Sequence, residues 1–180
     1  MARMHQALDP PTSLRSGLLH EQTLLRASLD AVVDALEGGD ARTITDAWMI
    51  FDSSLVAHLD AEDGQLISFV PHERSWRLLA HEHRHIRMRL DELRRALERQ
   101  ELRRGPLIDL RDVLHAHARN DDRLLYTWAE AELVDPHRAA VLLALEQRLA
   151  RLVERQRQLR DAMSDSITVK NSSTFTGFVK

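Results

Sequence analysis

The chain has 180 residues, of which 43% are hydrophobic and 29% are charged, and its formal net charge is −3. This balance is ordinary for a soluble globular protein and lacks the basic surplus of a general nucleic-acid-binding protein. The absence of cysteine excludes a disulfide framework, zinc–thiolate sites, iron–sulfur clusters and a cysteine nucleophile. No segment reaches the ~20 apolar residues that cross a bilayer, and the first residues lack a signal-peptide core. We therefore expect a cytoplasmic protein with no membrane or nucleic-acid partner.

The composition favours helices, because leucine, alanine, arginine and acidic residues are abundant whereas aromatic residues make up only 4%. Glycine and proline divide the chain into long segments. Asp40 can cap the second of these segments, and Gly105-Pro106 is expected to end the third. We predict helices at residues 13–37, 41–67, 73–102, 107–133 and 136–163.

Four long helices joined by short breaks predict an all-α fold, an antiparallel up-down-up-down four-helix bundle with an additional C-terminal helix. The fifth helix carries leucines at alternating spacings of three and four for most of its length. We expect this stripe to fold back on its own domain, with a homodimer through the fifth helix as the alternative. The stripe consists of Leu142, Leu145, Leu149, Leu152 and Leu159.

The chain is expected to divide into four parts: an N-terminal tail (1–12), the bundle (13–133), the fifth helix (134–163) and a C-terminal tail (164–180). The last part differs in composition, since it holds both lysines of the chain and is rich in serine and threonine. We interpret it as a flexible tail or a remnant of expression. A short address peptide that docks on a protein partner is the alternative.

Ten histidines accompany a single tyrosine, and histidine is the commonest metal ligand in proteins. Residues three, four and seven positions apart share one face of a helix. In the first helix, His20 shares its face with Leu24, Ala27 and Ala31. By the same test, each of the four bundle helices directs one histidine toward the core, and two of them add an acid one turn later. These residues are His20, His58, Glu62, His83, His117 and Asp121.

One such histidine is typical of an ordinary core residue, but four histidines and two acids facing one interior are different. Without a cation, their desolvation would exceed the marginal stability of the fold. Imidazole and carboxylate ligands without thiolate suit iron, manganese or zinc. Six candidate ligands, two of them acids that can bridge, indicate a pair of metals. Iron is the preferred ion, with zinc or manganese as alternatives.

The order of these motifs resembles that of the hemerythrin-like, or HHE cation-binding, family. The family pattern is His, then His-x-x-x-Glu, then His, then His-x-x-x-Glu/Asp on four successive helices. In this chain the motifs read LLHEQ, HLDAED, EHRHIR and HARNDD, and the resemblance covers about residues 13–133. It implies a four-helix bundle that holds a non-heme di-iron centre with bridging carboxylates. The six residues named above are the ligands that it implies.

Two of these ligand positions have alternatives. His81 and His85 form a His-x-x-x-His pair that looks like the pair of the oxygen-carrying hemerythrins, about 200° around the helix from His83. The longer apolar stripe runs through His83, which is therefore preferred. On the fourth helix, Asp121 faces the apolar side, whereas the spacing of the oxygen carriers would select Asp122.

The resemblance and the candidate ligands predict a protein that binds O2, NO or peroxide, or that senses iron or redox state. One alternative is a di-iron enzyme of peroxide breakdown or oxidase type, because the same ligands can serve binding and catalysis. Another is a metal-free helical adaptor, or a cargo protein, that docks a larger assembly through its C-terminal tail. Tyr126 is expected to close the edge of the core, with a role beside the metals as the alternative.

Overall fold

The computed structural model describes residues 13–38, 40–70 and 73–173, and the regular elements in these ranges are all helical. This confirms the all-α class for the described part of the chain, while the expected tail at 1–12 lies outside it. In the same part, no helix has both the length and the apolar character needed to cross a membrane. The elements are α1 (Leu14–Gly38), α2 (Ala41–Gln65), η1 (Ile67–Phe69), α3 (Glu73–Glu98), α4 (Arg104–Asn120), η2 (Asp121–Tyr126), α5 (Thr127–Glu132) and α6 (His137–Ser173).

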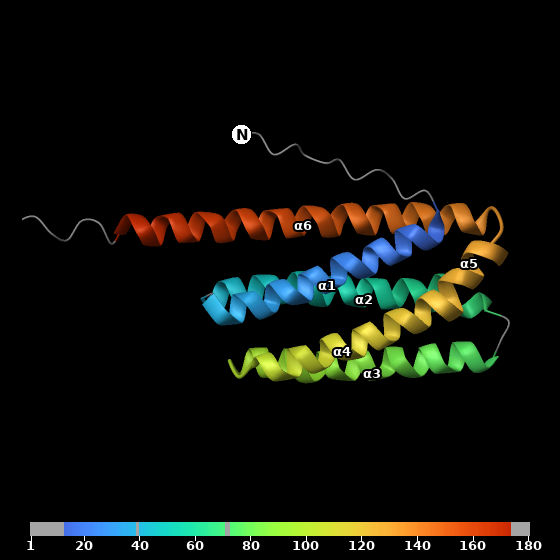
Figure 1. Cartoon of the computed structure of the whole chain (residues 1–180), viewed down its shortest axis with the longest axis horizontal. Helices are drawn as coiled ribbons and strands as arrows, with labels where there is room; N and C mark the ends of the chain where they lie inside the picture. The colour runs from blue at the N-terminus through green and yellow to red at the C-terminus, as the bar shows by residue number, and fades with distance from the viewer. Residues whose placement is uncertain (1–12, 39, 71–72, 174–180) are drawn as a thin grey trace, which may run out of the picture.

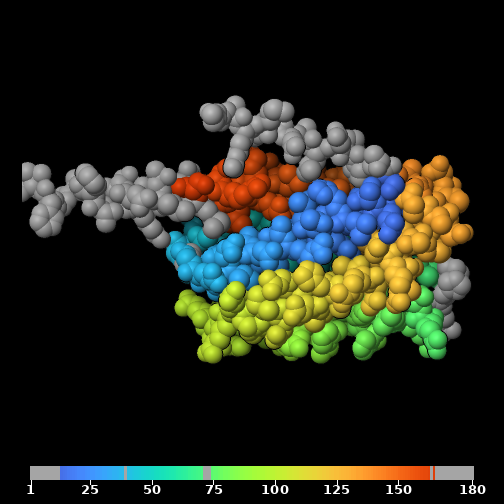
Figure 2. Space-filling view, viewed as in Figure 1, coloured from blue at the N-terminus to red at the C-terminus, as the bar shows by residue number. Residues whose placement is uncertain are grey.

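Helix α1 lies in the middle of the arrangement and packs against α2, α4 and α6 (Figure 1). Its side chains separate those of α6 from those of α4 on the face shown in Figure 2. Helix α3 packs against α2 and α4 on the side away from α6. Helix α6 therefore folds back along α1 and α2, as its leucine stripe predicts, and buries Leu145, Leu149, Leu152 and Leu159.

The ends of the helices follow local chemistry that was only partly predictable. Asp40 caps α2 as expected, because its Oδ1 accepts a hydrogen bond of 2.9 Å from the backbone N–H of Thr43. The expectation that Gly105-Pro106 ends the third helix is wrong. Helix α3 ends at Glu98, and both residues lie in the first turn of α4, where a proline has no helical hydrogen bond to lose.

The helical run at the C-terminus is longer than predicted. We expected the fifth helix to end near residue 163, but α6 continues to Ser173. The remaining residues of the expected tail, 174–180, lie outside the described residues. The first ten residues of that tail, 164–173, therefore belong to a helix that starts on the body of the protein.

The core consists of two apolar clusters along the helices with a polar layer between them. Leu25, Leu55, Ile86 and Leu114 belong to one cluster, and Leu18, Leu66, Leu79 and Leu125 belong to the other. The polar layer supplies buried groups from α1, α2, α3 and the α4–η2 run, none of which exposes more than 6% of its surface. These are Glu21, Gln22, His58, Glu62, His83, His117 and Asp121. Burial of so many polar groups requires that each of them has a partner.

Candidate metal centre

Four side chains of the polar layer converge at one point. Glu62 comes from α2, His83 from α3, His117 from α4 and Asp121 from the start of η2. Each offers one ligand atom, and these atoms all lie within 4.8 Å of one another. Each residue exposes at most 3% of its surface. The structure thus brings together four of the six predicted ligands in a geometry that could hold a metal ion.

Each residue of this group has one buried side-chain atom without a hydrogen-bond partner among the described residues. These atoms are Nε2 of His83 and His117, Oε2 of Glu62 and Oδ1 of Asp121. The Nε2 atom of His83 lies 3.2 Å from Oε2 of Glu62, and that of His117 lies 3.1 Å from Oδ2 of Asp121. A buried polar atom without a partner costs about 1–3 kcal/mol. A cation bound between the four atoms would remove this cost, so nitrogen and oxygen donors here fit a metal.

Three histidine rings are each paired with a carboxylate at Nδ1, the ring nitrogen that points away from the centre. Each Nδ1 atom lies within hydrogen-bond distance of one acid, which leaves Nε2 directed toward the centre. The pairs are His58 with Glu21 at 3.1 Å, His83 with Asp63 at 2.8 Å and His117 with Glu82 at 2.9 Å. This pairing is typical of metal-binding histidines, because the carboxylate fixes the tautomer and the orientation of the ring.

Sequence reasoning missed these three acids, although a signal was present. Each of them is the immediate neighbour of a predicted ligand: Glu21 follows His20, Asp63 follows Glu62, and Glu82 precedes His83. A neighbouring residue lies 100° away around a helix, so it reaches the ligand of an adjacent helix rather than the centre itself. Paired acid and ligand positions on facing helices could have indicated this arrangement.

The two remaining predicted ligands lie outside the four-residue group. The Nε2 atom of His58 is 3.4 Å from Oε1 of Glu62, whereas His83 contacts the other oxygen, Oε2. Glu62 therefore has imidazoles beside both of its oxygens. His20 is half-buried, and its Nε2 atom is buried without a hydrogen-bond partner among the described residues.

The predicted face of α1 was rotated relative to the observed one. The face assigned to His20 includes Ala27, which is exposed, while Glu21 and Gln22 are buried. In a sequence pattern, two adjacent polar residues such as Glu21 and Gln22 predict that their face of the helix is exposed to solvent. Here they are buried because each has a polar partner on another helix.

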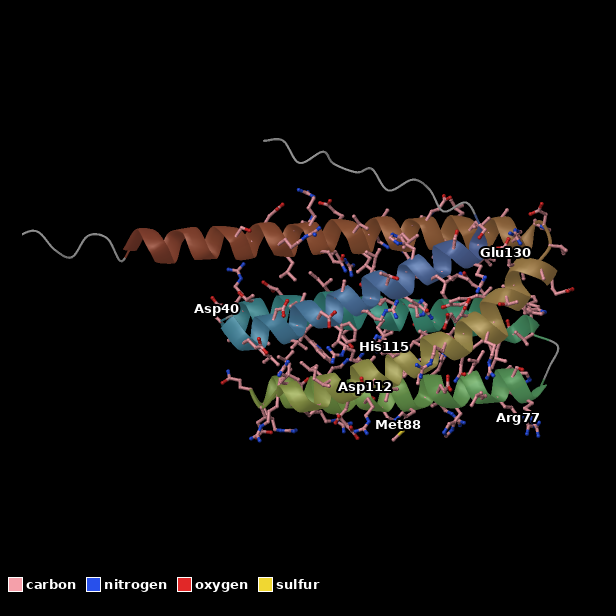
Figure 3. The ribbon with its side chains drawn as sticks, in the orientation of Figure 1. Asp40, Arg77, Met88, Asp112, His115 and Glu130 are labelled. Carbon is pink, nitrogen blue, oxygen red and sulfur yellow. The ribbon has the colours of Figure 1, made fainter. Side chains whose placement is uncertain are left out.

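The structure also separates the alternatives on α3. His81 and His85 are exposed, and so is Met88, one turn further along the same face. Arg77 and Met88 point away from the other helices (Figure 3). His83 is 1% exposed and lies on the opposite, buried face.

The two aspartates at the start of η2 also lie in different places. Asp121 is fully buried, whereas Asp122 forms an ion pair of 2.7 Å with Arg15 near the surface. The segment that follows is π-helical, and the N–H of Thr127 bonds to the carbonyl of Asp122, five residues earlier. Such segments occur frequently at functional sites, because the extra residue in the turn redirects side chains. The sequence pattern predicts a continuous regular helix at 107–133 and does not identify this π-helical segment.

A family model, the hemerythrin HHE cation binding domain, matches residues 74–179. The chain belongs to the hemerythrin HHE family. The match includes His83, His117 and Asp121 and begins after His58 and Glu62, so it covers a different range from the motif order on residues 13–133. No curated protein and no solved structure matches the chain. The family is one of cation-binding domains, and the buried cluster provides ligands of the required types.

The charges of this hemerythrin-like centre depend on one another. Burial opposes the ionisation of Glu62, but the imidazoles of His58 and His83 outweigh this effect and lower the pKa of the carboxyl. Burial likewise opposes a charge on His83, but its hydrogen bond to Asp63 and its close approach to the carboxylate of Glu62 raise its pKa to about 9. Burial and the negative charge of Glu62 raise the pKa of Asp121 well above its usual range. Without a metal, His83 therefore carries a proton at neutral pH, and the environment of Asp121 favours its protonated form.

Tyr126 contacts the hemerythrin-like centre and does not lie at the edge of the core, where we expected it. Its hydroxyl donates a hydrogen bond of 2.5 Å to Oε1 of Glu62. Nε2 of Gln22 donates to the hydroxyl oxygen of Tyr126 at 2.8 Å and to Oδ2 of Asp121 at 2.9 Å. Burial and the negative charges of Glu62 and Asp121 raise the pKa of Tyr126 well above its usual range. The phenol therefore stays protonated and acts as a donor.

A small cavity of about 20 Å³ adjoins His58 and His117. A cavity of this size holds about one water molecule. Most of its wall is apolar, so the space beside the two rings excludes larger polar molecules. The lining residues are Gln22, Leu25, Arg26, Leu55, His58, Leu114, His117 and Ala118.

Proposed function

We propose that this protein is a non-heme di-iron protein that binds O2, NO or peroxide, or senses iron or redox state, in the core of an antiparallel up-down-up-down bundle. The proposed ligands are His20, His58, Glu62, His83, His117 and Asp121. The observation that carries the proposal is the position of Glu62, whose two oxygens face imidazoles on different sides. Zinc or manganese is the alternative occupant.

Glu62 has the placement of a bridging carboxylate. One of its oxygens lies beside His58, and the other lies beside His83, with His117 at 3.8 Å. A carboxylate with nitrogen donors at both oxygens can join two cations, and Asp121 adds a second carboxylate. His20 offers a further buried ring nitrogen without a partner among the described residues, and it is assigned as a ligand on that ground.

The surroundings support a small ligand. The cavity beside His58 and His117 has room for about one small molecule, and leucines from three helices line it. When bound, iron would supply reversible coordination and electron transfer. The chain itself excludes bulk water with Leu25, Leu55 and Leu114, and Gln22 and Tyr126 supply hydrogen-bond donors to the carboxylates of the proposed ligands.

Peroxide breakdown is a second candidate, favoured by the buried phenol. Tyr126 lies one hydrogen bond from Glu62, and Gln22 links it to Asp121, so a protonated donor stands next to the proposed ions. Release of O2 from added peroxide by the iron-loaded protein separates this function from reversible binding. Steady release over many turnovers supports catalysis, whereas a single stoichiometric reaction supports binding.

Elemental analysis of the purified full chain tests the proposal. We expect near two irons per chain after anaerobic loading with Fe2+ and exposure to air, with oxo-bridged charge-transfer absorption in the near ultraviolet. A chain that takes up no stoichiometric metal would overturn the proposal and leave the adaptor interpretation. One tightly bound zinc with a featureless spectrum would instead indicate a structural or hydrolytic site.

A further inference from the structure

The side chain of Arg148 on helix α6 reaches the polar layer of the core. The side chain of Arg148 is 10% exposed and donates to both oxygens of Glu21, from Nε to Oε1 at 2.7 Å and from Nη2 to Oε2 at 3.1 Å. Glu21 itself is 3% exposed. Two parallel bonds between a guanidinium and a carboxylate fix the plane of the carboxylate as well as its position.

Glu21 passes this constraint to His58. Its Oε2 atom lies 3.1 Å from Nδ1 of His58, and the same ring places Nε2 3.4 Å from Oε1 of Glu62. Arg148, Glu21 and His58 thus form a chain of contacts from α6 through α1 to α2. The residues at its two ends are far apart in the sequence, and none of the three side chains exposes more than 10% of its surface.

The other two orienting carboxylates are held in a comparable way. Asp63 forms an ion pair of 2.9 Å with Arg87, and Glu82 accepts a hydrogen bond of 2.6 Å from Asn120. These supports come from α3 and α4, which also carry His83 and His117. For His58, the corresponding support comes from α6. Without it, Glu21 would be a buried carboxylate with one imidazole partner, free to rotate or to take up a proton.

We propose that Arg148 is a positioning residue for the metal centre, and that α6 thereby helps to build the centre in addition to covering the apolar side of α1 and α2. This inference rests on the proposed function. Arg148 holds Glu21, Glu21 orients the ring of His58, and the ring then presents Nε2 to the ion beside Oε1 of Glu62. Loss of Arg148 should therefore weaken the His58 end of the centre more than the His83 and His117 end.

The structure offers a specific rescue for such a variant. Glu21 and Arg148 line a pocket of about 120 Å³ between α2 and α6, together with Ser53 and Arg151. In an Arg148→Ala chain, this pocket would gain the space vacated by the side chain. A guanidinium ion from solution could then occupy the place of the natural head group against Glu21.

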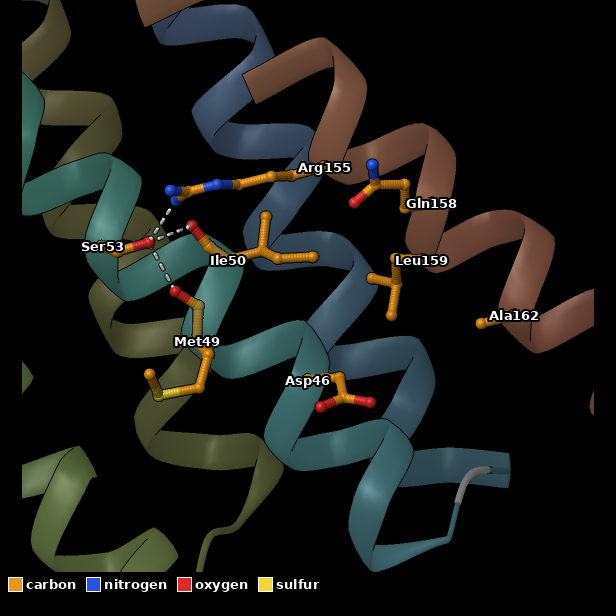
Figure 4. A pocket seen from close by; sticks show the side chains of 8 residues that line it. All are labelled: Asp46, Met49, Ile50, Ser53, Arg155, Gln158, Leu159 and Ala162. Carbon is orange, nitrogen blue, oxygen red and sulfur yellow. Dashed lines mark hydrogen bonds between the residues drawn. The ribbon is translucent and has the colours of Figure 1, made fainter. Parts of the chain in front are cut away.

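Arg155 provides a matched control on the same helix. It reaches from α6 to α2 and donates a hydrogen bond of 2.8 Å to Oγ of Ser53, as Figure 4 shows at a neighbouring groove. Arg155 joins α6 to α2, whereas Arg148 joins α6 to α1, and no hydrogen bond or ion pair links Arg155 to Glu21 in the described structure. Arg155→Ala therefore reports loss of an α6 contact without loss of the Glu21 contact.

The experiment measures Co2+ and anaerobic Fe2+ binding by the full-length variants in competition with a chelator. Arg148→Ala should lose about 10- to 100-fold in affinity for one of the two ions, while Arg155→Ala stays near the wild-type value. Millimolar guanidinium should restore binding to Arg148→Ala, and tetramethylammonium of equal charge should not. Equal losses in both variants, or failure of guanidinium alone to restore binding, would reduce Arg148 to a packing role and overturn the inference.

A second variant keeps the test decisive if Arg148→Ala does not fold. Glu21→Gln retains the size of the side chain but removes the charge that Arg148 and His58 share, so it should lose affinity for the same ion. Adding Arg148→Ala to Glu21→Gln should then cost little more, because both changes remove one connected unit. If Glu21→Gln binds metal with wild-type affinity, the inference about Arg148 is overturned but the proposed function is not. A wild-type chain that binds no metal would overturn the proposed function as well.

Discussion

The hydroxyl of Tyr126 donates a hydrogen bond to Oε1 of Glu62, the same oxygen that lies 3.4 Å from Nε2 of His58. The tyrosine lies at the end of the π-helical segment that Asp121 begins. This segment of six residues therefore places the carboxylate of Asp121 in the centre and the phenol of Tyr126 against the carboxylate of Glu62. Gln22 donates to both Asp121 and Tyr126, so α1 holds the two ends of this segment together.

Tyr126→Phe should destabilise the metal-free protein and alter the metal-loaded spectrum. The change leaves Oε1 of Glu62 without its phenolic donor and Nε2 of Gln22 without one acceptor, while it conserves the ring that packs in the core. Loss of these two buried hydrogen bonds, with Gln22 still bonded to Asp121, predicts a decrease of about 1–3 kcal/mol in the free energy of unfolding. Denaturant titration and near-ultraviolet absorption check this. Wild-type values in both measurements would contradict a contact between the hydroxyl and Glu62.

Asp121→Asn and Asp122→Asn should behave in opposite ways despite their adjacency. Asp121→Asn should lose metal but leave the metal-free protein nearly as stable as the wild type, because the raised pKa of Asp121 already favours its neutral form. Asp122→Asn removes an ion pair with Arg15 whose side chains are 46% and 33% exposed, so it should cost at most about 1 kcal/mol. Elemental analysis and denaturant titration distinguish them. Retained metal in Asp121→Asn would assign the ligand elsewhere.

Parts of the site that depend on a single helix were predictable from the sequence. His83 shares a face with Ile86 and Leu90, both fully buried, so periodicity alone selected it over His81. The same reasoning placed His58, Glu62 and the leucine stripe of α6. These predictions need only the 3.6-residue period, because an apolar stripe must face the core wherever the neighbouring helices lie.

Contacts between distant segments were not predictable in this way. The pair between Arg148 and Glu21 joins residues 127 positions apart, and the buried face of α1 became clear only when such partners were known. The π-helical segment carries no glycine or proline that would mark it. Polar residues at Glu21 and Gln22 indicate a solvated face by pattern, and tertiary hydrogen bonds reverse that reading.

Metal binding should release protons and should strengthen as the pH rises. The pKa of His83 is raised to about 9, so this residue carries a proton at pH 7 in the metal-free protein, and burial and Glu62 raise the pKa of Asp121 and so favour its protonated form. A metal ion must displace these protons to reach Nε2 and the carboxylate. Each released proton adds about a tenfold gain in apparent affinity per pH unit, because one pKa unit is worth about 1.4 kcal/mol.

Titration calorimetry at pH 7 in two buffers of different ionisation enthalpy measures this release directly. We expect at least one proton per chain on binding of the ion beside His83. Affinity measured by chelator competition between pH 6 and 8 should rise over the same interval. A binding constant that does not change with pH, together with equal heats in both buffers, would show that the ligands are already deprotonated.

His83→Ala should lose metal and stability together, whereas His81→Ala should lose neither. The ring of His83 lies between Asp63 and Glu62, at 2.8 Å and 3.2 Å, so its removal leaves the buried Glu62 with one fewer positive neighbour. Breaking a buried charge pair by removing one partner costs about 3–5 kcal/mol. His81 is exposed on the opposite face of the same helix, and a surface substitution changes stability by less than about 0.5 kcal/mol.

Thermal unfolding with and without added Fe2+ provides the measurement: the ion should raise the Tm of the wild type and of His81→Ala but not that of His83→Ala. Loss of the metal-dependent increase in His81→Ala would mean that α3 presents its other face to the bundle, and it would remove His83 from the centre.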